Sequence, residues 1–180
     1  MIKPSQLCSG NRPERQTLDE PLHHLTACHR RIEERLDTLE RVIPHWEARS
    51  EDALAAVRSA FRFFSTNGVW HTEDEERSIF PRMRDRLSPG ELAYLADLER
   101  QHDAAEAAYA HLCRIVDAFQ DPPSAAWIAD YAAAAGTLAR LYREHIASED
   151  TRLAAIGARV LTAGQLRDIS TEMKARRGLS

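Results

Sequence analysis

The residues best suited to chemistry in this sequence are histidines that interrupt lines of apolar side chains. They are His29, His71, His102 and His145. Their apolar neighbours recur at steps of three and four, the spacing of one face of an α-helix. Two glutamates continue the same lines, Glu75 one turn after His71 and Glu149 one turn after His145. Buried imidazoles and ionised carboxylates are costly without a partner, so the combination predicts a bound metal.

Four periodic segments carry these lines, and each predicts one helix. They span residues 22–43, 54–78, 92–116 and 128–156. Pro81 is expected to end or kink the second helix. The sequence Ser-Pro-Gly-Glu at 88–91 is typical of a helix start, and 121–124 forms the clearest loop. A fifth short helix is expected over 165–176, where Thr162 and Gln165 have the spacing of a capping box.

The spacing of the histidines places them at one level of an antiparallel bundle. In helices joined by a short loop, two residues at equal depth are equidistant in sequence from that loop. The midpoint of His29 and His71 is Ser50, and the other two midpoints fall at 86–87 and 123–124. All three lie in expected connections. One histidine on an apolar face is more often an ordinary core residue, but four at one depth indicate coordination. The predicted fold is all-α, an up-down-up-down antiparallel four-helix bundle with a short fifth C-terminal helix.

Composition indicates a single domain that is not a nucleic-acid binder. The 180 residues carry a net charge of −4 with both signs interspersed. We expect an N-terminal extension at 1–18, the bundle at 19–160 and a C-terminal helix or tail at 161–180. No signal peptide or membrane-spanning run is expected. Three widely spaced cysteines (Cys8, Cys28 and Cys113) predict reduced thiols in a cytoplasmic protein.

The donor types narrow the choice of metal. Imidazole nitrogens and carboxylate oxygens suit iron, manganese or zinc and exclude a Cys-rich structural zinc site. Six ligands exceed what one tetrahedral ion needs, so two octahedral ions with bridging carboxylates fit better. A ferritin-like centre needs Glu-x-x-His on two helices, and Glu99-x-x-His102 is the only such pair on a plausible helix face.

The chain resembles the hemerythrin family, in its bacterial HHE cation-binding branch, over residues 19–156. The resemblance rests on Cys-His-Arg-Arg-Ile at 28–32, His-Thr-Glu-Asp-Glu-Glu-Arg-Ser-Ile-Phe-Pro at 71–81, Gln-His at 101–102 and His-Ile-Ala-Ser-Glu-Asp at 145–150. It implies a non-haem di-iron centre in a four-helix bundle. The ligands that it implies are His29, His71, Glu75, His102, His145 and Glu149.

Two departures from the oxygen-carrying members leave further ligands open. Those members have a second histidine one turn after the third-helix histidine, where this chain has Glu106. They also place an aspartate five residues after the fourth-helix histidine, which is Asp150 here, whereas the HHE branch uses the position of Glu149. A carboxylate in place of an imidazole would favour the diferric state and argues against simple reversible O2 carriage.

The expected function is a di-iron sensor or binder whose partner is O2, NO or peroxide. The alternatives are a redox enzyme that consumes peroxide or NO, an iron-handling protein, and a helical interaction module with a vestigial or zinc-filled site. The sequence gives no indication of a protein partner. His23 and His24 are expected at the surface, although a slip of one turn would bring His24 in place of His29.

Overall fold

The computed structural model describes residues 17–179, and all regular structure in this range is helical. The first rod of the bundle is α2 (Pro21–Arg41), followed by a short 3-10 turn, η3 (Ile43–His45). The second rod is a continuous helical path made of α-helical and π-helical pieces and a final 3-10 turn. In order these are α3 (Ser50–Phe63), η4 (Phe64–Gly68), α4 (Val69–Glu73), η5 (Asp74–Ile79), α5 (Phe80–Met83) and η6 (Arg84–Arg86).

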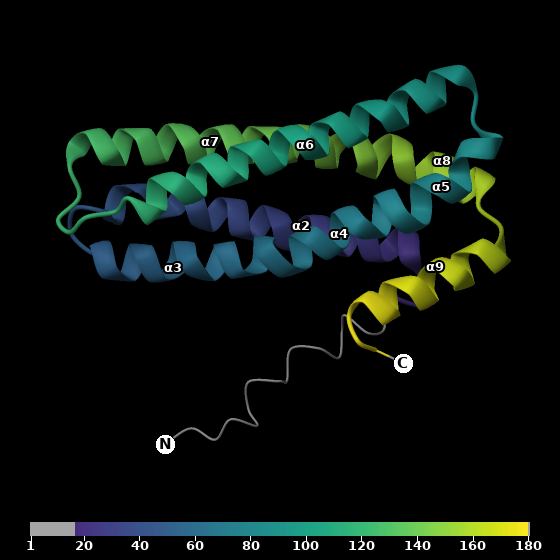
Figure 1. The fold of residues 1–180 in the computed structure, drawn as a ribbon, viewed down its shortest axis with the longest axis horizontal. Helices are drawn as coiled ribbons and strands as arrows, with labels where there is room; N and C mark the ends of the chain where they lie inside the picture. The colour runs from purple at the N-terminus through teal and green to yellow at the C-terminus, as the bar shows by residue number, and fades with distance from the viewer. Residues whose placement is uncertain (1–16, 180) are drawn as a thin grey trace.

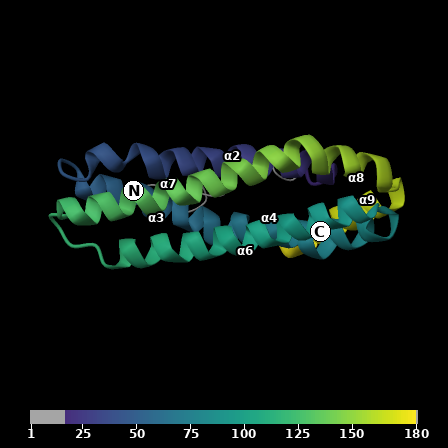
Figure 2. The ribbon, with the colours of Figure 1, turned by 90° about the horizontal axis from the view of Figure 1, so that it is seen from above.

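The third and fourth rods complete an up-down-up-down arrangement, as predicted (Figure 1). The third is α6 (Pro89–Asp117), and the fourth joins α7 (Ala125–Ser148), η7 (Glu149–Leu153) and α8 (Ala154–Val160). Figure 2 shows the same rods from above, again lying lengthwise along one another. The fifth helix, α9 (Ala163–Arg176), begins two residues before its predicted start and packs on η5 and α2.

Side-chain caps fix where three of these helices begin. Ser88 accepts from the backbone N–H of Glu91, whose carboxylate accepts from the N–H of Ser88, and this closes a capping box at α6. Thr162 and Gln165 form the same device at α9, as their spacing predicted. The Ser124 hydroxyl caps α7. These caps satisfy N–H groups that a helix start leaves unpaired.

Pro81 does not end the second rod at its own position. The helix continues to Met83, because the π-helical turn η5 precedes the proline and widens the backbone where its ring would clash. The Ser78 carbonyl accepts a hydrogen bond from the Arg82 guanidinium at 2.9 Å. A side chain thus binds a carbonyl close to the proline, which itself donates no backbone hydrogen bond.

The apolar core is divided into two clusters, one toward each end of the bundle. One is centred on the fully buried Trp46 and Tyr131, and the other on Phe80 and Met83. In α2 the two clusters are separated at His29, since Leu25 belongs to one and Ile32 to the other. The polar residues of the candidate site therefore form a layer between two apolar blocks.

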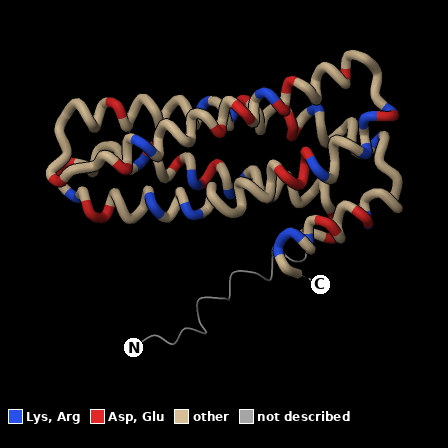
Figure 3. Tube along the Cα trace, in the orientation of Figure 1, with Lys and Arg blue, Asp and Glu red and all other residues tan. Residues whose placement is uncertain are grey.

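Several expectations concern the chain ends and the surface. Residues 1–16, including Cys8, lie outside the described residues, whereas Leu18 of the expected extension is fully buried in the core. Of the described helices, none has the length and apolar character needed to cross a membrane. Acidic and basic residues are interspersed along the rods (Figure 3).

Candidate metal centre

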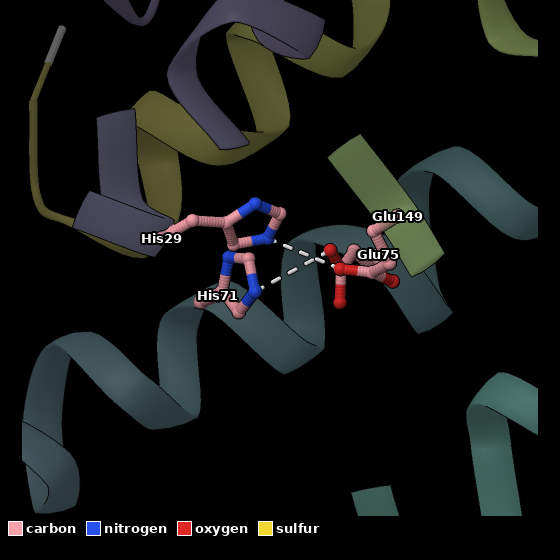
Figure 4. A group of neighbouring side chains, drawn as sticks. All are labelled: His29, His71, Glu75 and Glu149. Atoms are coloured by element: carbon pink, nitrogen blue, oxygen red, sulfur yellow. Dashed lines mark hydrogen bonds and ion pairs between the residues drawn. The ribbon is translucent and has the colours of Figure 1, made fainter. Parts of the chain in front are cut away.

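Side chains from all four rods meet in the polar layer. Two groups of potential ligands form there, and within each group the donor atoms lie within 4.8 Å of one another. The first contains His29 from α2, His71 from α4, Glu75 from η5 and Glu149 from η7 (Figure 4). The second contains His102 from α6, His145 from α7 and the same two glutamates. These are the six residues that the sequence singled out.

Each shared carboxylate lies between histidines of both groups. Glu149 Oε2 is 3.1 Å from His29 Nε2 and 3.2 Å from His145 Nε2. Glu75 Oε1 is 3.4 Å from His71 Nε2, and its Oε2 is 3.2 Å from His102 Nε2. Two cations, one in each group, could therefore share both carboxylates as bridges. Every histidine presents its Nε2 atom toward this interior.

Outer partners orient three of the four rings. The Nδ1 atom of His29 lies 2.7 Å from Asp150 Oδ1, and that of His102 lies 2.8 Å from Glu76 Oε1. The Nδ1 atom of His145 lies 3.1 Å from the Gln101 side-chain oxygen. An acceptor at Nδ1 fixes the proton there and leaves Nε2 free to bind a metal.

The two open positions, Glu106 and Asp150, lie outside both groups. Asp150 contacts the back of the His29 ring rather than the shared interior. Glu106 is exposed and lines a surface cleft beside His102. The arrangement gives Asp150 an orienting position and leaves Glu106 at the entrance to the layer.

Two outer partners, Glu76 and Gln101, were missed by the sequence reasoning. A signal for one was present, because an acidic residue directly follows both Glu75 and Glu149. These two acidic residues, Glu76 and Asp150, each reach a histidine of another rod. Gln101 carries no such pattern and is recognisable only from the packing of α6 on α7.

The interior of the layer is short of hydrogen-bond partners. Within residues 17–179, both ring nitrogens of His71, both carboxylate oxygens of Glu75 and Oε1 of Glu149 are buried without one. Burial, followed by the charge of Glu149, raises the pKa of Glu75 well above its usual range. Burial, with the neighbouring His29, lowers the pKa of His71. Cations in the two groups would pair His71 Nε2 and the carboxylate oxygens, so the residues present fit a metal centre.

The pKa values of His29 and Glu149 also fit a metal centre. Burial would lower the pKa of His29, but the hydrogen bond to Glu149 and the charges of Glu149 and Glu75 raise it to about 9. Burial opposes ionisation of Glu149, yet hydrogen bonds from His145 and His29 hold its pKa well below the usual value. Without a metal, protons on imidazoles balance the charge of Glu149, and metal binding would displace them.

A second polar cluster lies beside the layer, and it corrects the expectation that His24 is exposed. His24 is fully buried, with Nδ1 2.8 Å from the Thr17 hydroxyl and Nε2 3.4 Å from Cys28 Sγ. Asp74, next to Glu75, is also fully buried and pairs with Arg176 and with Arg177, whose Nη2 is 2.8 Å from Oδ2. The end of α9 thus closes over the residue adjacent to a shared carboxylate. His24 does not replace His29 in the layer.

Comparison with known proteins agrees with this geometry. A family model described as the hemerythrin HHE cation binding domain matches residues 20–156, which include both groups of donors and the parts of all four rods that carry them. No curated protein matches the chain. The match covers well over half of the 180 residues, and α9 lies beyond it. The chain belongs to the hemerythrin family.

Proposed function

We propose that the layer binds two iron ions, one in each group of donors, with Glu75 and Glu149 as bridges. The observation that carries this proposal is the position of each carboxylate between one histidine of each group. Each ion would take two imidazole nitrogens and an oxygen from each glutamate. The donor set also accepts manganese or zinc, since all three metals combine with imidazole and carboxylate.

We further propose that the centre binds O2, NO or peroxide as a sensor or binder. When bound, iron would supply the redox-active centre that combines with such ligands. The protein side chains hold it, orient the imidazoles and exclude bulk water. In the described part of the chain, no other group of His, Cys, Asp and Glu is arranged to hold a metal.

A second candidate is a di-iron enzyme that consumes peroxide or NO. The observation in its favour is the solvent-open cleft beside His102 and His145, because turnover requires repeated access and release. The two functions differ in what happens to H2O2. A binder gives a lasting spectral change, whereas an enzyme removes H2O2 continuously.

Metal analysis of the purified protein is the primary test. We expect about two irons per chain after anaerobic Fe²⁺ titration, followed by optical changes on adding O2, NO or H2O2. His71→Ala should lower the iron content, because His71 is buried in the first group. His111→Ala is the matched control, since His111 lies exposed on α6 outside both groups. A protein without iron, in which His71→Ala changes neither metal content nor melting temperature, contradicts the proposal.

A further inference from the structure

The two donor groups differ in their access to solvent. A cleft of about 460 Å³ opens beside His102 and His145. A second space, beside His29 and Glu149, measures about 10 Å³ and is lined by Leu22, Leu25 and Leu153, among others. That volume is about one water molecule at most. Of these two spaces, the cleft beside the second group is the one large enough to admit a small ligand from solvent.

The inner wall of the cleft is aromatic and contains one hydroxyl group whose hydrogen-bond donor is not used within the described residues. The Phe64 ring packs 5.6 Å from Tyr109 and 5.5 Å from Tyr142, measured between ring centroids. The Tyr109 hydroxyl donates to the Phe61 carbonyl at 3.2 Å and is thus occupied. Tyr142 lies one turn before His145 on α7, and within the described residues its hydroxyl has no hydrogen-bond partner.

Charge at the mouth of the cleft limits which ligands enter. The lining includes the acidic residues Glu73, Glu76, Asp103 and Glu106. The single basic residue among the lining residues is Arg77, which pairs with Glu73 at 2.9 Å. This excess of negative charge disfavours anions and leaves small neutral molecules unaffected.

We propose that a small neutral ligand, of the class of O2, NO or H2O2, enters through this cleft, binds at the His102–His145 group and accepts a hydrogen bond from the Tyr142 hydroxyl. The proposal rests on the proposed function, because it requires a metal in the layer. Burial, with the charges of Glu75 and Glu106, raises the pKa of Tyr142 to about 12. The hydroxyl therefore keeps its proton at neutral pH and remains a donor.

The route of entry is tested with a pair of obstructing variants. A Cβ atom at Gly68 would meet Phe64 Cδ1 at 3.6 Å, an ordinary contact, so Gly68→Leu is accommodated at its base and narrows the cleft. Thr26→Leu is the matched control, because Thr26 lines the small space beside His29. The rate at which NO changes the optical spectrum of the reduced, iron-loaded protein should fall in Gly68→Leu and stay unchanged in Thr26→Leu. The reverse pattern, or equal rates, overturns the route.

The donor role is tested with two conservative variants that leave the fold intact. Tyr142→Phe should weaken NO binding about 2- to 10-fold, the usual loss for one hydrogen bond. Tyr109→Phe should leave NO binding unchanged, because its hydroxyl is occupied by a backbone carbonyl. Equal affinities in the two variants overturn the role of Tyr142.

The effect of the negative charge at the mouth, or rim, of the cleft is tested by comparing the binding of azide with that of NO. Glu106→Gln should speed binding of the azide anion and leave the NO rate unchanged, because the substitution removes one negative charge at the entrance. All variants are first analysed for iron. A wild-type protein without iron refutes the proposed function itself, whereas full iron content with unaltered ligand kinetics refutes the cleft alone. Loss of iron in Glu106→Gln would make Glu106 a ligand and overturn its place at the rim.

Discussion

The buried charge of Asp74 supports a quantitative prediction about stability. Its side chain is fully buried, and that of its partner Arg177 is 3 % exposed. Replacing Asp74 with alanine leaves Arg177 buried without its main counter-charge, and breaking a buried pair in this way costs about 3–5 kcal/mol. We therefore expect Asp74→Ala to lower the free energy of unfolding by about that amount. For a chain of this length, the melting temperature should fall by about 6–20 °C.

Glu172→Ala on α9 is the matched control. Glu172 pairs with Arg82 at 2.6 Å, but its side chain is 40 % exposed. A pair of that exposure is worth at most about 1 kcal/mol. Both variants should be compared with the wild type at equal iron loading, with thermal unfolding monitored by circular dichroism. Hydrogen exchange should also show α9 losing protection in Asp74→Ala.

The comparison has a clear refuting result. That result is a free energy of unfolding for Asp74→Ala within about 1 kcal/mol of the value for Glu172→Ala, with α9 still protected from exchange. The apolar contacts of Ile169 and Met173, which are fully buried, would then hold α9 in place without the ion cluster. The reasoning from buried charge would be wrong for this protein.

Four further variants test other parts of the structure. Glu149→Gln should lower the iron stoichiometry. Asp150→Asn should keep both irons and weaken their binding about 10- to 100-fold, as expected for an outer partner of a ligand histidine. Equal stoichiometries of the two variants in a metal titration would contradict this. Burial, with the charges of neighbouring arginines, lowers the pKa of His24 to about 3. The unfolded chain therefore binds the extra proton between pH 6.5 and 3, and stability falls as the pH falls through that window. His24→Gln should remove about 2 kcal/mol of the loss between pH 7 and pH 5, measured by urea unfolding; an unchanged loss would refute it. Ser88→Ala should cost about 1 kcal/mol by removing the cap of α6, and an unchanged melting temperature would show that the cap contributes nothing.

The layer could be predicted because its information is local and periodic. Each histidine occupies an apolar line, and loop lengths alone place the four at one depth. Errors in the predicted burial of single residues arose from side-chain packing, which helical periodicity does not encode. Leu92 was placed on the apolar line of α6 but is 37 % exposed, while Tyr94 is buried and donates to the Ser148 carbonyl at 3.0 Å.

The second polar cluster could not be predicted for a different reason. His24 and Asp74 lie off the apolar lines, so helical periodicity places them at the surface. They are buried because Arg177, near the end of the chain, packs against both. Nothing in the local pattern of α2 or η5 indicates that α9 will cover them. Which glutamates act as ligands, and which only orient histidines, likewise depends on contacts between rods.

The π-helical turns let the apolar residues on either side face the core while the glutamates within the turns face the polar layer. Glu75 is the second residue of η5 and Glu149 is the first of η7, and their carbonyls accept from the N–H groups of Phe80 and Ala154 five residues on. A π turn holds one more residue than an α turn in the same helical path. Deleting Thr151 would turn η7 into an ordinary α-helix and keep the apolar residues on both sides aligned. A single-residue deletion, usually severe within a helix, is therefore expected here to be mild for folding and damaging for metal binding.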